Sequence, residues 1–420
     1  MMQINQRTFL SIFLGLAMVV LLGGCVASQQ PDLVEENHHE SEQSVKEPET
    51  QPPSESKPEE NQEEEEEVEI EEEPEEAEST FLPKEDVIEK LVAKMTLEEK
   101  IGQLLVVGFH SKQVDPHIRS MIQEYKVGGV ILYDRNMESK RQVSQLTEDL
   151  QELALGNDQP IPLMITIDQE GGQIVRMRDQ VAVKPSQQEL GMREDASAVY
   201  DTNYQTGEEL VEMGIDVNHA PVLDLSATDS RSFGDDPKKA EALGTQAIQG
   251  LNDAGVAATI KHFPGNGRSN IDPHYETSSV DANQLDLENK DIYPFKKIID
   301  TMDHEQLFVM VTHLKYPAYD KENPASISPV IIQDLLRGKL GYEGIVVTDD
   351  LEMGAVNKYF TYKDLGYSAV HAGNDLLLVC HTFESQKQVI QGIREAVETN
   401  KLSEERIDES VKRVLRYKMR

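Results

Sequence analysis

The stretch IVVTDD, residues 345–350, joins an apolar run to two adjacent carboxylates. An unbroken run of β-branched residues is typical of a parallel strand that is buried on both faces. Two charges at the end of such a strand are costly unless they are solvated, paired or used in chemistry. Successive strand residues face opposite ways, so we expect at most one of Asp349 and Asp350 to face the axis of a barrel. The alternative is that both carboxylates cap the next helix.

Seven further runs are β-branched or leucine-rich in the same way. They are LLVVGF (104–109), VILYD (130–134), LMITID (163–168), IDVNHAPVLDL (215–225), AATIKH (257–262), FVMVTH (308–313) and LLLVCH (376–381). Amphipathic helical patterns lie between them, one of which follows the helix-starting pair Ser328 and Pro329. Apolar residues that share a face in three of these patterns are Ile331, Ile332, Leu335 and Leu336; Val389, Ile390, Ile393 and Val397; and, after Ser403, Ile407, Val411, Val414 and Leu415.

Eight strands, each followed by a helix, predict an α/β fold, a single (β/α)8 barrel of TIM type over residues 81–420. A doubly wound open sheet is the structural alternative. Polar residues at the C-terminal ends of the runs favour the barrel, because in a barrel these ends converge on one mouth, where active sites are built. These residues are Asp168, Lys261, His262, His313, Asp349 and His381.

The first 25 residues have the pattern of a targeting segment. Arg7 precedes an apolar run, residues 9–22, whose length suits a signal-peptide core better than a membrane span. The LGGC that ends at Cys25 resembles a bacterial lipobox, in which the cysteine is lipidated and becomes the new N-terminus. We therefore expect a lipoprotein that is anchored in the cell membrane on its extracytoplasmic face. An ordinary secretory signal with an incidental cysteine is the alternative.

Residues 26–80 are predicted to be a disordered acidic linker. Within them, residues 31–80 hold 22 Asp and Glu against two Lys, with almost no large apolar side chains. Such a composition cannot bury enough surface to offset the entropy of ordering. The whole chain has a formal net charge of −37, which repels nucleic acid, so we expect no nucleic-acid partner.

The segment KHFPGNGRSNIDPH, residues 261–274, presents a candidate catalytic pair after the strand ends. Pro273 favours an extended geometry at Asp272, and in an extended chain residues two apart point the same way. Asp272 can then hold one ring nitrogen of His274 and leave the other facing a site, which suits a general acid or base. An incidental loop pair is an equal alternative. A metal site is disfavoured, since no trio with ligand spacing accompanies the histidines.

Motifs along residues 85–420 resemble glycoside hydrolase family 3, and in particular its single-barrel β-N-acetylglucosaminidases that act on muropeptide sugars. The motifs are MTLEEKIGQLLVVGF, ITIDQEGGQIVRM, GIDVNHAPVLDL with RSFGDDP, IKHFPGNG with DPH, PASISPVIIQDLLRGKLGYEGIVVTDDLEM and AGNDLLLVC. The resemblance implies retaining hydrolysis of a terminal β-linked N-acetylglucosamine. We expect a monomer that requires no cofactor. The resemblance implies Asp349 as nucleophile, His274 as acid/base and Asp272 as its partner, but no catalytic role for Asp350. The sugar-binding positions that it implies are Asp168, Arg176, Arg231, Lys261 and His262.

The chain departs from the family in the loop that carries the pair. Asn266 stands where the family usually has His, and Arg268 where it has Asp. We hypothesise that Arg268 contacts a carboxylate on the leaving group. The sequence thus predicts an exo-β-N-acetylglucosaminidase acting on GlcNAc-containing muropeptides. A family 3 β-glucosidase and a sugar-binding lipoprotein with weakened catalysis are the alternatives.

Overall fold

The computed structural model describes residues 84–269 and 277–420. Its main sheet consists of β1 (Leu105–Val107), β2 (Gly129–Leu132), β3 (Met164–Ile167), β4 (Val217–Asn218), β5 (Ala257–Phe263), β6 (Leu307–Val311), β9 (Val346–Thr348) and β10 (Leu377–Val379). Each strand coincides with one of the eight predicted runs and extends at most one residue beyond it.

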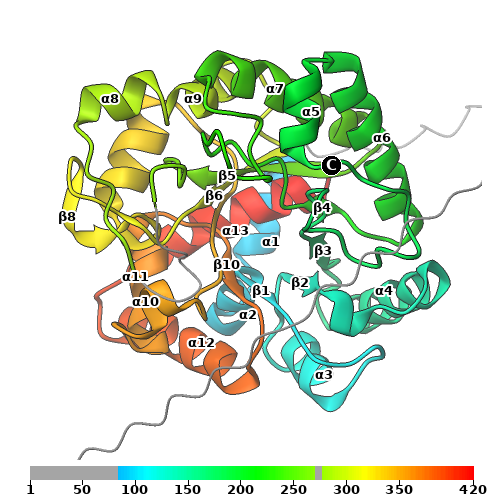
Figure 1. Cartoon of the computed structure of the whole chain (residues 1–420). Helices are drawn as coiled ribbons and strands as arrows, with labels where there is room; N and C mark the ends of the chain where they lie inside the picture. The colour runs from blue at the N-terminus through cyan, green and yellow to red at the C-terminus, as the bar shows by residue number, and fades with distance from the viewer. Residues whose placement is uncertain (1–83, 270–276) are drawn as a thin grey trace, which may run out of the picture. The chain divides into compact units, whose positions relative to one another are not determined.

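The strands form a nearly closed parallel barrel. Their order is β10-β1-β2-β3-β4-β5-β6-β9, and a parallel bridge between Val347 and Leu376 joins the two ends of the sheet. At this seam the backbone N–H of Thr348 donates to the carbonyl of Leu376 at 3.0 Å. The predicted (β/α)8 barrel is confirmed, and the open doubly wound sheet is excluded (Figure 1).

Helices surround the barrel (Figure 1). They are α1 (Lys84–Val92), α2 (Leu97–Gln103), α3 (Pro116–Gln123), η1 (Asp134–Asn136), α4 (Lys140–Leu155), α5 (Gln187–Arg193), α6 (Ala196–Glu212), α7 (Pro237–Asp253), α8 (Gln284–Asn289), α9 (Tyr293–Ile299), η2 (Ala325–Ile327), η3 (Val330–Lys339), α10 (Gly354–Asn357), α11 (Tyr362–Ala372), α12 (Phe383–Glu398) and α13 (Glu404–Lys418). A hairpin of β7 (Lys315–Tyr316) and β8 (Asp320–Pro324) follows β6. Among the helices of the described residues, none has the length and apolar character that a bilayer span requires.

Local sequence explains where helices begin. The Ser328 hydroxyl accepts a hydrogen bond from the backbone N–H of Ile331 at 3.3 Å, which satisfies one of the unpaired donors at the start of η3. This agrees with the predicted helix start, although η3 has π-helical geometry. Thr96 and Glu99 form a capping box at α2.

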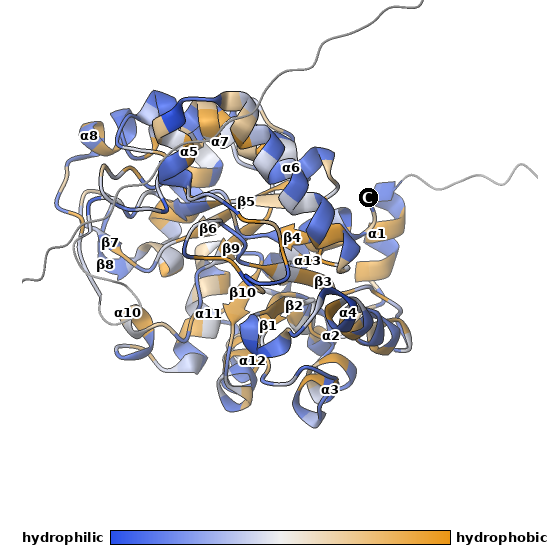
Figure 2. Cartoon of the chain, turned by 45° about the vertical axis from the view of Figure 1, so that its right-hand side comes forward, coloured by the Kyte–Doolittle hydropathy of each residue, from blue (hydrophilic) through white to orange (hydrophobic). Residues whose placement is uncertain are grey.

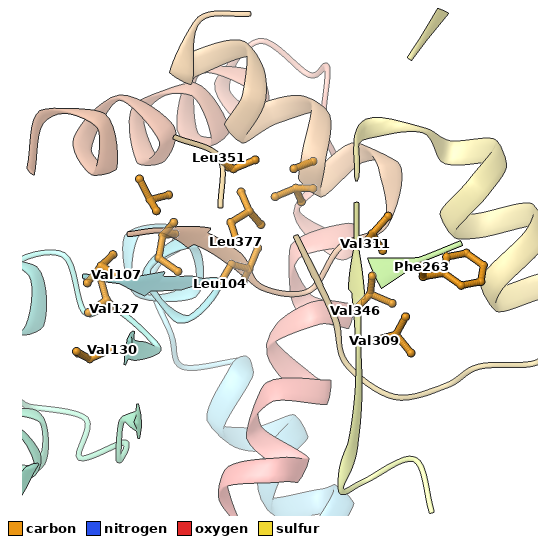
Figure 3. Packing of buried hydrophobic residues seen from close by; sticks show 14 of the residues in the cluster. Leu104, Val107, Val127, Val130, Phe263, Val309, Val311, Val346, Leu351 and Leu377 are labelled. Carbon is orange, nitrogen blue, oxygen red and sulfur yellow. The ribbon is translucent and has the colours of Figure 1, made fainter. Parts of the chain in front are cut away.

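Alternate residues of the strands belong to two separate apolar cores. Val106, Ile131 and Val347 cluster together inside the barrel. Their strand neighbours Val107 and Val346 belong to the larger core between strands and helices (Figure 3). Both faces of the sheet are therefore buried away from water, and for this reason the strand runs are apolar throughout. The helices instead carry apolar and polar residues in alternation (Figure 2).

The last helix, α13, closes the end of the barrel where the strands begin. Val414 and Tyr417 belong to the interior core, and the rings of Tyr417 and Phe308 meet edge to face at 4.9 Å. The Tyr417 hydroxyl donates to the carbonyl of Asp216, just before β4, at 3.0 Å. The interior is thus a packed core, and space for a ligand is left at the opposite end.

The buried carboxylate of Asp375 ties the closing seam to the helices. Its Oδ2 accepts from the backbone N–H of Val346 at 3.0 Å and from Arg337 at 2.6 Å. Its Oδ1 accepts from Ser410 at 2.7 Å and Arg413 at 3.2 Å, both on α13. Burial alone raises the pKa of Asp375, but the nearby arginines outweigh it and hold the pKa below its usual value.

Removing the Asp375 charge is expected to destabilise the domain. Asp375→Asn leaves Arg337 buried without its counter-charge, which costs about 3 kcal/mol. Because the pKa of Asp375 is lower in the folded state, the stabilisation by its charge is fully present above the unfolded-state pKa of about 4. This stabilisation is lost as pH falls through the folded-state pKa. Urea unfolding of wild type and variant at pH 7 and at pH 3 measures both effects, and the difference should shrink at pH 3.

Asp300→Asn is the matched control. Asp300 forms an exposed i,i+4 pair with Lys296, so its loss should cost no more than about 0.5 kcal/mol. Equal effects of the two substitutions at pH 7 would contradict the role given to Asp375.

Candidate active site

A cavity of about 720 Å³ opens at the C-terminal end of the barrel strands. Its lining includes every predicted sugar-binding residue and the predicted nucleophile: Asp168, Arg176, Arg231, Lys261, His262 and Asp349. His381 also lines it, whereas His313 is fully buried and hydrogen-bonds Ser326 and the carbonyl of Asp350. Asp272, His274 and Cys25 lie outside the described residues.

Two carboxylates and three cations form a connected cluster in the cavity wall, in which Arg176 lies 3.6 Å from Asp168. The Nζ of Lys261 lies 2.8 Å from Oδ1 of Asp168 and 2.7 Å from Oε1 of Glu170. The guanidinium of Arg231 donates two hydrogen bonds, of 2.7 and 2.8 Å, to the Glu170 carboxylate. Sequence reasoning assigned no role to Glu170, although it lies two residues beyond Asp168 in the same glycine-rich turn.

The cluster keeps its members ionised. Burial works against the charge of Glu170, but Lys261 and Arg231 outweigh it and lower the pKa of this carboxyl to about 2. Burial likewise opposes the charge of Lys261, and the two carboxylates raise its pKa above the usual value. The wall of the cavity therefore presents fixed charges and hydrogen-bonding groups to a polar ligand.

His262 is oriented by a carboxylate that sequence reasoning missed. Its Nδ1 lies 2.6 Å from Oδ2 of Asp224, which itself is buried and lines the cavity. A carboxylate only accepts hydrogen bonds, so Nδ1 carries the proton and Nε2 is left for a ligand. The sequence feature that could have identified Asp224 is its position near the C-terminal end of the run 215–225.

Lys261 and His262 both line the cavity although they are adjacent in β5. The pairing of β5 with β6 shifts register between Ile260 and Phe263, which breaks the simple alternation of faces at this point. The strand end thus contributes two neighbouring side chains to one site.

Asp349 lies at the end of β9, two residues after the inward-facing Val347. Its Oδ1 accepts from the backbone N–H of Asp350 at 2.9 Å. Burial alone raises the pKa of the Asp349 carboxyl, but the imidazoles of His262 and His313 outweigh it and hold the pKa below its usual value. The side chain is therefore an ionised carboxylate in the cavity, as a nucleophile must be.

Both of the paired carboxylates contribute to the cavity wall, although at most one of them was expected to face the barrel axis. Asp350 also lines the cavity. The strand ends at Thr348, so alternation no longer governs the side chain two residues later. Nor do both carboxylates cap the next helix, since α10 begins only at Gly354, after Met353, and has no side-chain cap.

The loop that leaves β5 is anchored up to the last described residues. The backbone N–H of Asn266 donates to Asp224 at 2.6 Å, and a Cβ on Gly267 would collide with the carbonyl oxygen of Leu225. Arg268 does not line the cavity in this structure, since its Nε donates to the buried Asp291 at 2.8 Å. Its contact with a leaving group stays a hypothesis, and that contact would have to compete with the ion pair to Asp291.

The described residues hold no cluster of three or more histidine, cysteine or acidic side chains arranged to bind a metal ion. The carboxylates of the cavity are instead engaged by cations, an imidazole or backbone N–H groups. Such a site offers many hydrogen-bonding groups to a polyhydroxylated ligand.

Comparisons with known proteins agree with this geometry. Residues 96–417 match the family model described as "Glycosyl hydrolase family 3 N terminal domain". The chain is 30% identical over 374 residues to "Beta-hexosaminidase A" of Pseudoalteromonas piscicida, covering 77% of this chain and 61% of that protein. It is 35% identical over 299 residues to a "Beta-hexosaminidase" of Nitrosomonas eutropha, covering 68% and 83%. The chain thus spans less than two thirds of the length of the first relative.

A solved structure is similar as well. It is a glycoside hydrolase family 3 β-N-acetylglucosaminidase from Paenibacillus sp., with a TM-score of 0.75 and 40% identity, and the alignment covers 77% of this chain and 62% of that one. The family model spans nearly the whole barrel, from α2 to α13. On this evidence the chain belongs to glycosyl hydrolase family 3, as its motifs predicted.

Proposed function

We propose that this glycoside hydrolase is a retaining exo-β-N-acetylglucosaminidase that removes terminal β-linked N-acetylglucosamine from peptidoglycan fragments. The observation that carries the proposal is the position of the Asp349 carboxylate in a cavity walled by paired charges. The names of the relatives, which are β-hexosaminidases and a β-N-acetylglucosaminidase, support the sugar. The muropeptide substrate rests on the motif resemblance.

In the proposed mechanism, the Asp349 carboxylate attacks the anomeric carbon and displaces the leaving oxygen. This forms a covalent glycosyl-enzyme, which water then hydrolyses with retention. His274, oriented by Asp272, gives a proton to the leaving oxygen and later takes one from the attacking water. Most retaining glycosidases use a second carboxylate for this task. An imidazole with an ordinary pKa near 6.5 suits proton transfer close to neutral pH.

The cluster around Lys261 fits the sugar-binding role. Asp168 and Glu170 provide acceptors for hydroxyl groups, and Arg176 and Lys261 provide donors. The Nε2 atom of His262 is the one left for a ligand by its contact with Asp224. No cofactor enters this mechanism.

We further propose that the protein is anchored to the outer face of the cell membrane through a lipid on Cys25. The acidic composition of residues 26–80 suits a spacer between this anchor and the barrel, because like charges repel one another. This places the enzyme where cell-wall fragments are found.

Replacing Asp349 tests the nucleophile. Asp349→Ala removes the group that attacks the sugar, so kcat/KM for 4-nitrophenyl N-acetyl-β-D-glucosaminide should fall at least about a thousandfold. A 5-fluoro N-acetylglucosaminide should trap a glycosyl-enzyme, detected by intact mass and located on Asp349 by peptide mapping. Label on another residue would contradict the assignment.

The same assay tests the proposed function against its alternatives. Faster hydrolysis of 4-nitrophenyl β-D-glucoside than of the N-acetylglucosaminide would favour a β-glucosidase. Binding of N-acetylglucosamine without turnover of either substrate would favour a sugar-binding lipoprotein.

Replacing His274 tests the acid/base role. His274→Ala should lower kcat/KM by about 10²- to 10⁴-fold for a sugar leaving group, which needs a proton. A 2,4-dinitrophenyl leaving group needs little protonation, so the formation of the glycosyl-enzyme from that substrate should be nearly unaffected. Equal losses for both leaving groups in pre-steady-state measurements would rule out proton donation by His274.

Replacing Cys25 tests the anchor. Cys25→Ser removes the thiol that carries the lipid, so the protein should leave the membrane fraction or remain as an unprocessed precursor. Fractionation with metabolic labelling by a palmitate analogue measures this, with Cys380→Ser as the control that keeps both label and location. Labelled Cys25→Ser protein would disprove the assignment.

A further inference from the structure

His381 is a cavity residue to which the proposed mechanism gives no task. It follows β10 at the barrel mouth and lines the same cavity as Asp168 and Asp349. Its side chain keeps 42% of its surface exposed. An imidazole in this position is within the reach of a ligand that fills the cavity.

The backbone and ring of His381 are nevertheless held in place. Its N–H donates to the Glu352 carboxylate at 2.6 Å, as does the N–H of Thr382 at 3.1 Å. Its ring lies 5.6 Å from the ring of Tyr133, centroid to centroid. A polar side chain that is fixed without being buried is preorganised for binding, because little conformational freedom is lost when a ligand arrives.

The Asp350 carboxylate lies beside one nitrogen of this ring. Its Oδ2 lies 3.2 Å from Nε2 of His381, and a bare nitrogen lone pair facing a carboxylate oxygen is repulsive. The other oxygen, Oδ1, is occupied by the backbone N–H groups of Glu352 at 3.1 Å and Cys380 at 3.2 Å. In the neutral ring a proton on Nε2 avoids this repulsion, and in that tautomer Nδ1 is a hydrogen-bond acceptor.

We propose that His381 contacts the substrate and that its Nδ1 accepts a hydrogen bond from a hydroxyl or amide N–H of the bound sugar. The inference rests on the proposed function and deepens it, since it assigns a specificity-determining residue to the same site. A site that accepts from a substrate donor discriminates against analogues that lack this donor. Asp350 is then a positioning residue that acts through the His381 ring.

Three variants separate the contact from a merely structural role. His381→Phe keeps a ring against Tyr133 but removes the acceptor, and His381→Asn restores an acceptor oxygen. In Asp350→Asn the amide oxygen stays with the two backbone N–H groups, so the NH₂ faces His381. That arrangement favours the proton on Nδ1 and turns the acceptor into a donor.

Kinetics on 4-nitrophenyl N-acetyl-β-D-glucosaminide and calorimetric binding of N-acetylglucosamine provide the readouts. His381→Phe should raise KM and the Kd of the sugar about tenfold, the loss of roughly one hydrogen bond, and change kcat less than threefold. Asp350→Asn should weaken sugar binding to a similar extent, and His381→Asn should recover part of the loss. His371→Phe, an exposed histidine stacked on Tyr367 in α11, is the control that should change neither constant.

Monodeoxy N-acetylglucosamines identify the donor on the sugar. The analogue that lacks it should bind wild type about tenfold more weakly than the parent sugar, yet bind His381→Phe as well as the parent does. An analogue that lacks another hydroxyl should lose the same factor in both proteins.

The contact is overturned if His381→Phe, folded with wild-type thermal stability, binds N-acetylglucosamine as wild type does. It is also overturned if kcat alone falls. Unchanged binding by Asp350→Asn would overturn the assigned tautomer. Wild-type protein that binds the sugar through His381 but hydrolyses no N-acetylglucosaminide would disprove the proposed function and retain the contact.

Discussion

The hydrogen bond between the Asp375 carboxylate and the backbone of Val346 holds the seam on which the site depends. An open parallel sheet with this strand order would have β10 and β9 as its two edge strands. The sheet closes into a barrel with a mouth only where β9 pairs with β10. Asp375 supplies a side-chain acceptor at the start of that seam and links it to η3 and α13 through arginines. Closure then brings the ends of strands that are more than 200 residues apart around one cavity.

The cavity itself is organised by charge balance. Asp168 and Glu170 are matched by Lys261 and Arg231, so no charge of this cluster is left uncompensated out of water. Buried ion pairs contribute little net stability relative to apolar residues, because desolvation offsets their attraction. These ion pairs instead fix the positions of the side chains. Each charged group is held at a place where a hydroxyl of a sugar can replace one of its hydrogen-bond partners.

The loop that departs from the family pattern is anchored mainly through its backbone. The N–H of Asn266 reaches Asp224, and the carbonyl of Gly265 accepts from the Tyr316 hydroxyl at 2.7 Å. Neither contact depends on the side chain at position 266, so a change from histidine to asparagine leaves them intact. Arg268 adds a side-chain anchor to Asp291. The start of the segment that carries Asp272 and His274 is thus held despite its altered sequence.

The sequence by itself determined the eight strands, the barrel class and the residues at the strand ends. Strands buried on both faces must be apolar throughout, so a polar residue such as Asp168 or Asp349 marks where burial stops. The motifs added the family and the identity of the candidate nucleophile.

Only the tertiary structure decided which groups touch one another. Alternation along β9 predicted that at most one of Asp349 and Asp350 faces the barrel axis, but the strand ends at Thr348 and both carboxylates line the cavity. Asp224 and Glu170 were missed because the side chains that they bind, His262 and Arg231, lie 38 and 61 residues away in the chain. The pattern of apolar and polar residues along a strand indicates which side chains are buried. Which charged side chains pair with each other depends on barrel closure, because closure brings together residues that are far apart in the chain.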